Sequence, residues 1–182
     1  MKRLTLAVAV LFAGSFAQAR VLHEVRMPDT VNILGRQVKL NGMGLRKKFI
    51  FDVYVAGLYV ESPTRDPAEI IASDQVKRMT LFVLRDLGRD KIGEALREGF
   101  QENAKEQMPA LKDRLDHLVA MVPDAKKGSS IVITYFPGTG TSLATSSERS
   151  VISGKDFADA LFSVWLGPQV PEDSLKKGLL GN

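Results

Sequence analysis

The stretch from Phe49 to Val60 is apolar on both of its alternating faces, and this feature constrains the fold more than any other in the sequence. Side chains of a β-strand point alternately to opposite faces of a sheet. One face would carry Phe49, Phe51, Val53, Val55 and Tyr59, and the other Ile50, Asp52, Tyr54, Ala56, Leu58 and Val60. Because both faces need cover, we expect this strand in the middle of a sheet between two layers. We expect the wholly apolar face in the main core, and the face with Asp52 and Tyr54 at a cleft.

Further strands alternate with helices along the rest of the chain. Residues 31–61 are extended in character, and residues 76–84 and 131–136 predict two more strands. A Pro-Gly-Thr-Gly turn and residues 141–145 then predict a hairpin, because the Gly-Thr-Gly-Thr run lacks the lysine and the following helix of a phosphate-binding loop. Apolar spacing predicts helices at residues 68–72, 89–105, 111–122, 157–165 and 171–180. This order favours the antiparallel α+β class over a parallel βαβ sheet.

The N-terminus has the features of a secretory signal peptide in their usual order. Residues 1–3 are Met-Lys-Arg, residues 4–16 are almost entirely apolar, and residues 17–19 are Ala-Gln-Ala, a small-x-small cleavage site. The apolar run is about thirteen residues long, against roughly twenty for a membrane-spanning helix. We therefore predict cleavage after Ala19 and a single mature domain of residues 20–182, in the periplasm or secreted. An uncleaved membrane anchor or a buried first helix is the alternative interpretation.

Composition argues against several kinds of chemistry. The chain has no cysteine, so it has no disulfide, thiol nucleophile or lipidated cysteine. Its net charge is +4, and its lysines and arginines are interspersed with Asp and Glu. This pattern is typical of a solvated surface and not of a nucleic-acid binding site. His23 and His117 have no partner at metal-ligand spacing, and no Gly-x-Ser-x-Gly elbow is present. We expect no cofactor, no metal, no nucleic-acid partner and no membrane span in the mature chain, and the sequence leaves a protein partner open.

A glycine-rich segment with an arginine is the strongest candidate for a binding site. Gly42 and Gly44 allow close approach of another group to the backbone, and Arg46 follows them directly before the apolar strand. Arginine carries a permanent charge and a planar fork of donors that matches a carboxylate or another oxyanion. An arginine at an apolar cleft would suit a fatty acid or a phenolate. An exposed basic strand end is the alternative interpretation.

Several motifs together resemble the chalcone isomerase-like superfamily, and most closely its bacterial, exported branch. They are Gly44-Leu45-Arg46, the strand ending in Gly57-Leu58-Tyr59-Val60, residues 87–100, residues 131–143 with the Pro-Gly-x-Gly turn, and residues 157–180 with Trp165-Leu166-Gly167. The resemblance covers nearly the whole mature chain in order. It implies an open-faced β-sandwich with a large antiparallel sheet, a helical layer on one face and a ligand cleft between them.

The same resemblance implies three ligand-binding residues. Arg46 matches the arginine that stabilises oxyanions in the plant isomerases and holds a carboxylate in fatty-acid-binding relatives. Lys91 matches the lysine at the start of the cleft helix, and Tyr54 stands where the family has a threonine.

Other family partners are absent from this chain. The tyrosine and asparagine positions of the cleft helix fall on Gly88 and Ala95, and a polar position of the C-terminal helix falls near Ala158. We therefore expect a binding protein for a fatty acid or a similar amphipathic anion and assign no catalytic residue. An intramolecular lyase that closes an oxygen ring, and a structural or interaction protein, are the two alternatives.

Overall fold

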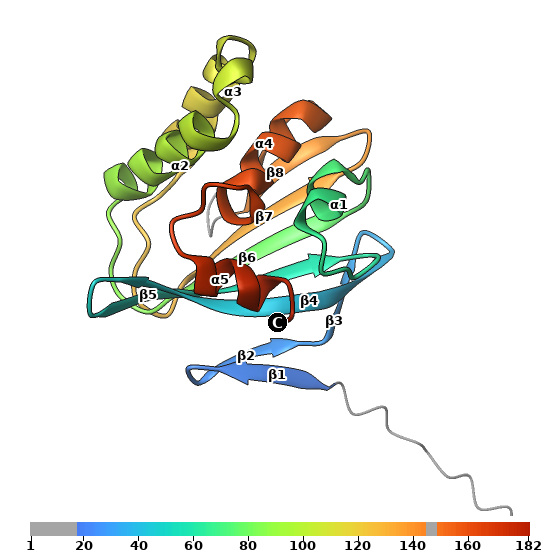
Figure 1. The fold of residues 1–182 in the computed structure, drawn as a ribbon, viewed down its shortest axis with the longest axis vertical. Coiled ribbons are helices and arrows are strands. Elements are labelled where there is room, and N and C mark those ends of the chain that lie inside the picture. The colour runs from blue at the N-terminus through green and yellow to red at the C-terminus, as the bar shows by residue number, and fades with distance from the viewer. Residues whose placement is uncertain (1–17, 145–148) are drawn as a thin grey trace, which may run out of the picture.

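The computed structural model describes residues 18–144 and 149–182, which form a curled sheet with helices on one face (Figure 1). Residues 1–17 of the predicted signal peptide lie outside the described residues. Among the described residues, the buried members of the two hydrophobic cores lie between Val25 and Leu180. Within the described part, no helix is long and apolar enough to cross a membrane.

The large sheet contains seven strands among the described residues, and every neighbouring pair is antiparallel. Its order is the order of the chain: β3 (Thr30–Ile33), β4 (Arg36–Lys48), β5 (Phe51–Val60), β6 (Lys77–Val83), β7 (Ser130–Phe136), β8 (Gly140–Ala144) and β9 (Arg149–Ile152). The predicted antiparallel α+β class and the hairpin of β7 and β8 are confirmed. Strand β5 lies inside the sheet, as its two apolar faces require.

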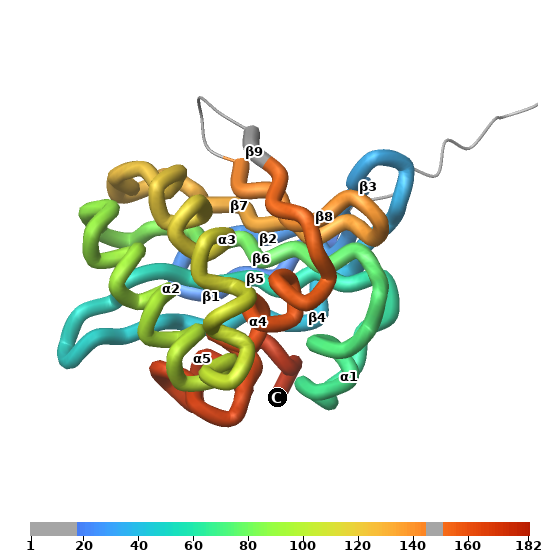
Figure 2. Tube along the Cα trace, turned by 90° about the horizontal axis from the view of Figure 1, so that it is seen from above, coloured from blue at the N-terminus to red at the C-terminus, as the bar shows by residue number. Residues whose placement is uncertain are grey.

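The helical layer covers one face of this sheet (Figures 1 and 2). Its members are α1 (Pro67–Ala72), α2 (Arg89–Asn103), the short 3-10 helix η1 (Lys105–Gln107), α3 (Met108–Met121), α4 (Lys155–Leu166) and α5 (Asp173–Leu179). Helix α4 is central, with α1 and α2 on either side of it and α3 packed on α2. From Phe157 to Leu166, α4 is buried except at Asp159, because it lies between the sheet and its helical neighbours.

The opposite face of the sheet is covered only in part, by a separate hairpin that the sequence did not predict. Strands β1 (Ala19–Leu22) and β2 (Val25–Pro28) form a two-stranded sheet below β4 and β5 in Figure 1. The hairpin encloses a second, smaller core that contains Met27 and Tyr59. The fold is therefore an open-faced sandwich, with one full layer and one partial layer on the large sheet.

The two faces of β5 pack in the opposite cores from those that we expected. The main core under the helices contains Ala56, Leu58 and Val60, which share a face with Tyr54. Val55 and Tyr59, on the wholly apolar face, lie in the smaller core. The expectation was wrong because the polar residues of the helix-facing side occur only at the beginning of the strand, and the remainder of that side is apolar enough for the main core.

Candidate functional site

Arg46 and Tyr54 lie side by side at the edge of the interface between the sheet and the helical layer. They are directly opposite each other in the antiparallel pairing of β4 and β5. A register irregularity between Leu40 and Gly42 changes which side chains of β4 face the helices, so Leu40 lies in the smaller core whereas Gly42, Gly44 and Arg46 face the helical layer. The sequence-predicted arginine and tyrosine are therefore brought together by strand pairing.

The two glycines before Arg46 allow close approach, and the group that approaches is helix α5. A Cβ atom on Gly44 would lie 2.5 Å from the carbonyl oxygen of Leu175, and a Cβ on Gly42 would overlap the backbone of Gly178. Gly178 in turn has no room for a side chain beside Met43. The sequence argument for close approach is confirmed, and its physical reason is backbone-to-backbone packing of α5 on β4. This packing fixes the start of α5 beside Arg46.

The Arg46 guanidinium is held by the segment that enters α5. Its Nη1 lies 3.4 Å from Oε2 of Glu172 and 3.3 Å from the carbonyl oxygen of Pro171, and it also donates to the carbonyl of Lys47. About one-fifth of each charged side chain is exposed, 21% for Arg46 and 22% for Glu172. The pair therefore lies at the boundary between the core and the solvent.

Both carboxylate oxygens of Glu172 accept hydrogen bonds. Besides Arg46, its Oε2 accepts a hydrogen bond of 2.6 Å from the backbone N–H of Lys47, and its Oε1 accepts one of 2.8 Å from the hydroxyl of Ser174. Partial burial acts to raise the pKa of Glu172, but these hydrogen bonds and the charge of Arg46 outweigh it and lower the pKa below its usual value. Charge-assisted bonds from arginine and from a backbone amide are the interactions that an ionised carboxylate needs when it leaves water.

Tyr54 extends this site toward the core. Its hydroxyl oxygen accepts a hydrogen bond of 3.0 Å from Nε1 of Trp165 in α4. Burial raises the pKa of the Tyr54 phenol, while the Trp165 hydrogen bond and the charge of nearby Arg46 act in the opposite direction. The phenol is therefore neutral at physiological pH, and its O–H group is able to donate to an anion.

Lys91 occupies a different part of the surface. It is exposed in the first turn of α2, and among the described residues no hydrogen bond or ion pair connects it to Arg46 or Tyr54. Gly88 caps the start of the same helix and Ala95 is exposed on it, whereas Ala158 is fully buried in α4. The structure thus joins two of the three predicted ligand-binding residues.

Sequence reasoning did not find Glu172 as the partner of Arg46. The two residues are 126 positions apart, and Pro171-Glu172-Asp173 indicated only the start of a helix. Trp165 belongs to the Trp-Leu-Gly motif, but its contact with Tyr54 spans 111 positions. No local spacing encodes either contact.

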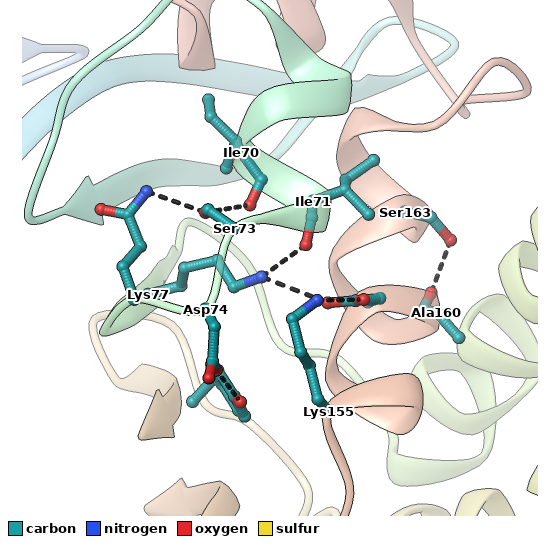
Figure 3. Close-up of polar contacts among 11 residues, drawn as sticks. Ile70, Ile71, Ser73, Asp74, Lys77, Lys155, Ala160 and Ser163 are labelled. Atoms are coloured by element: carbon teal, nitrogen blue, oxygen red, sulfur yellow. Dashed lines mark hydrogen bonds and ion pairs between the residues drawn. The ribbon is translucent and has the colours of Figure 1, made fainter. Parts of the chain in front are cut away.

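A second cation lies deep in the same layer and was also missed. Lys77 on β6 is completely buried, and its Nζ donates 2.7 Å to the carbonyl of Ile71 and lies 3.4 Å from Oδ1 of Asp159 (Figure 3). The rings of Tyr135 and Phe162 lie 5.2 and 5.5 Å from the ammonium. Burial lowers the pKa of Lys77, although the charge of Asp159 opposes the shift. This lysine lies within the predicted strand 76–84, where no pattern distinguishes a buried from an exposed lysine.

Two hollows on the described surface lie away from Arg46. One, of about 290 Å³, lies on the hairpin side of the sheet beside Met27, Tyr59 and Phe82. The other, of about 810 Å³, lies between α2 and α3 and is lined by both acidic and basic side chains. Neither is lined by Arg46, Tyr54 or Lys91, and the guanidinium of Arg46 is paired with Glu172. Among the described residues no cluster of His, Asp and Glu could hold a metal ion.

The structure is an antiparallel sheet with a helical layer on one face, and Arg46 on β4, the first long strand of this sheet, contacts the segment that enters α5. The family model of chalcone isomerase-like proteins matches residues 19–181, and the chain belongs to that family. The structure is similar to the crystal structure of a fatty-acid binding protein from Arabidopsis thaliana, with a TM-score of 0.71 and 15% sequence identity over 91% of this chain and 97% of that chain. At this identity the similarity establishes the fold. A comparison with curated proteins found no match.

Proposed function

We propose that the protein binds a fatty acid or a similar amphipathic anion without catalysing a reaction. The observation that carries the proposal is the carboxylate of Glu172 on Arg46 and the Lys47 amide. A ligand carboxylate would take this place when the segment before α5 moves Glu172 away. Tyr54 would donate to the second oxygen of the ligand, and Lys91 would add positive potential from the start of α2.

The position of the site at the edge of the main core supports an apolar tail. Trp165 and Leu175 lie next to Tyr54 and Gly44 and belong to this core. A tail that follows these side chains would pass between β4 and α5, which have to move apart because α5 packs directly on Gly42 and Gly44. The resemblance in fold to a fatty-acid binding protein is consistent with this ligand class.

The experiment that tests the proposal is a ligand titration of delipidated residues 20–182 with a C12 to C18 fatty-acid series. We expect Arg46→Ala to weaken binding by about 1.5–3 kcal/mol, which is the value of a hydrogen bond to a charged group. The matched control is Arg36→Ala, which also removes an arginine–glutamate pair (2.7 Å to Glu61) but lies at the other end of β4. Its affinity should equal that of the wild type.

Two results would contradict the proposal. Fatty alcohols that bind as tightly as fatty acids would show that Arg46 does not recognise a carboxylate. Turnover of a chalcone above the spontaneous rate, lost in Arg46→Ala, would replace the binding role by an intramolecular lyase.

We further propose that the chain is a bacterial exported protein, cleaved after Ala19 and located in the periplasm or secreted. The basic, apolar and small-residue order of residues 1–19 supports this proposal. N-terminal sequencing of the protein recovered from the cell envelope or the medium should begin at Arg20. A sequence that begins at Met1 would contradict cleavage.

A further inference from the structure

The turn between β4 and β5 presents consecutive large apolar side chains to solvent. Lys48 and Phe51 are paired, so the turn consists only of Phe49 and Ile50. The exposed fractions are 89% for Phe49, 86% for Ile50 and 49% for Phe51. In two perpendicular views the end of this hairpin projects beyond the rest of the sheet (Figures 1 and 2). We call residues 47–51 the hairpin tip.

The backbone of this turn gives no reason for an aromatic residue at its apex. Phe49 has φ = +56°, a conformation that favours glycine or asparagine and strains a bulky side chain. Because its ring is almost fully exposed, it gains little contact with the protein in return. A strained, exposed aromatic residue at the apex of a tight turn is therefore better explained by a contact outside the chain.

Cationic side chains surround the apolar apex. Lys47 and Lys48 are exposed on one strand, and Arg85 stacks on the ring of Phe51 with its Cζ 4.3 Å from the ring centroid. The two residue pairs next to the turn are Lys48 with Phe51 and Lys47 with Asp52. Asp52 is the one carboxylate in these pairs, and its Oδ1 lies 3.0 Å from Lys47 Nζ. The tip thus combines apolar residues at its end with an excess of positive charge behind them. This is the arrangement by which peripheral proteins insert into anionic membranes.

We propose that the hairpin tip docks on an anionic lipid bilayer. Phe49 and Ile50 enter the interface, and Lys47, Lys48 and Arg85 contact the headgroups. A bilayer fits better than a second protein, because protein interfaces are broad and disfavour lysine at their centres. A narrow convex tip enters a deformable surface without a matching pocket.

The proposed docking of the hairpin tip does not depend on the proposed fatty-acid ligand. The position of the tip nevertheless bears on the ligand site. Arg46 adjoins the tip and lies three residues from Phe49 in the chain. A docked tip therefore places the candidate head-group site close to the lipid surface.

The test is co-sedimentation of residues 20–182 with vesicles of phosphatidylcholine alone or with about one-third phosphatidylglycerol. We expect binding to the anionic vesicles, and a loss of about tenfold in partitioning for the double variant Phe49→Ser, Ile50→Ser. The matched control is Leu34→Ser, at the turn of the β3–β4 hairpin, where Leu34 is also 80% exposed with φ = +49°. It should partition like the wild type. Lys47→Gln with Lys48→Gln should reduce binding to the anionic vesicles more than binding to the neutral ones.

Three results would overturn the proposal. They are no binding of the wild type to anionic vesicles, equal binding of the Phe49 and Ile50 double variant, and equal losses for that variant and Leu34→Ser. Self-association of the wild type that disappears in the double variant, without vesicle binding, would assign the tip to an interface between copies. Fatty-acid affinity without vesicles should be unchanged in the double variant, so failure of docking and failure of the proposed function are separable.

Discussion

Two polar clusters connect the sheet to the helical layer, and they differ in what their cations are able to do. The Arg46 cluster consists of Arg46, Tyr54, Trp165 and Glu172, and the Lys77 cluster of Lys77, Asp74, Tyr135, Lys155 and Asp159. Each contains a cation on a strand, a tyrosine on the neighbouring strand and a carboxylate from the helical layer or the segment that enters it. Figure 3 shows the second cluster between α1 and α4.

Burial makes the difference between the two. The Lys77 side chain has no exposed surface, and its ammonium is fixed by a helix carbonyl and two aromatic rings. Arg46 keeps about one-fifth of its surface exposed, and its carboxylate partner lies on a connecting segment. The Arg46 side chain is itself partly exposed to a solute carboxylate, whereas the Lys77 side chain has no surface that a solute could contact. Similar residue types thus give a structural anchor in one place and a candidate ligand site in the other.

The largest effect that we expect is from Lys77→Ala, which should lower the free energy of unfolding by about 2–5 kcal/mol because it leaves a cavity in the main core. Urea denaturation measures this loss.

The substitution Lys77→Met keeps most of the side-chain volume, and Lys155 still pairs with Asp159 at 2.6 Å. Its cost to the free energy of unfolding should therefore be below about 2 kcal/mol. Arg46→Met should cost about 1 kcal/mol or less, as expected for a partly exposed ion pair. Equal costs for Lys77→Ala and Arg46→Met would remove the distinction between the clusters.

Much of the fold could be predicted from the sequence because its elements have strong periodicity. The predicted helix at residues 157–165 is α4 (Lys155–Leu166), and that at 89–105 is α2 (Arg89–Asn103). The β1–β2 hairpin was missed because its strands are short and its turn residues, His23 and Glu24, adopt positive φ without the usual glycine or asparagine.

The candidate site was predictable only in part. Arg46 and Tyr54 belong to consecutive strands, so a local hairpin register brings them together. Glu172, Trp165 and Asp159 reach their partners across 82 to 126 residues, and only the packed fold determines those contacts.

A smaller effect should distinguish the two tyrosines. Tyr54→Phe removes the acceptor of the Trp165 N–H, and leaving this donor unpaired among apolar residues should cost about 1–3 kcal/mol. Tyr135→Phe removes a hydrogen bond to Asp74, an exposed residue that water can solvate, so we expect a loss of only about 0.5–1.5 kcal/mol. Thermal or urea unfolding of both variants measures the difference. A larger loss for Tyr135→Phe would mean that the Lys77 cluster depends on its tyrosine more than the Arg46 cluster does.

The smallest effect should come from Glu172→Gln and should have opposite signs for stability and binding. At pH 7 the variant loses a charged acceptor for the Lys47 N–H and Arg46, at a cost of about 0.5–1 kcal/mol. The pKa of Glu172 is lowered in the folded protein, so its contribution is present above the unfolded value of 4.5 and is lost as the pH falls through the folded value. The stability difference between wild type and variant should therefore shrink from pH 7 to pH 3.

Fatty-acid affinity should rise in Glu172→Gln, by about fivefold or about 1 kcal/mol, because the ligand no longer displaces an internal carboxylate. The matched control is Glu61→Gln, since the pKa of Glu61 is also lowered, by its hydrogen bond to Arg36. This control should lose stability with a similar pH dependence and bind fatty acid like the wild type. An affinity in Glu172→Gln that is equal to or below that of the wild type would show that Glu172 does not occupy the ligand's place, and Arg46 would then be a structural residue like Lys77.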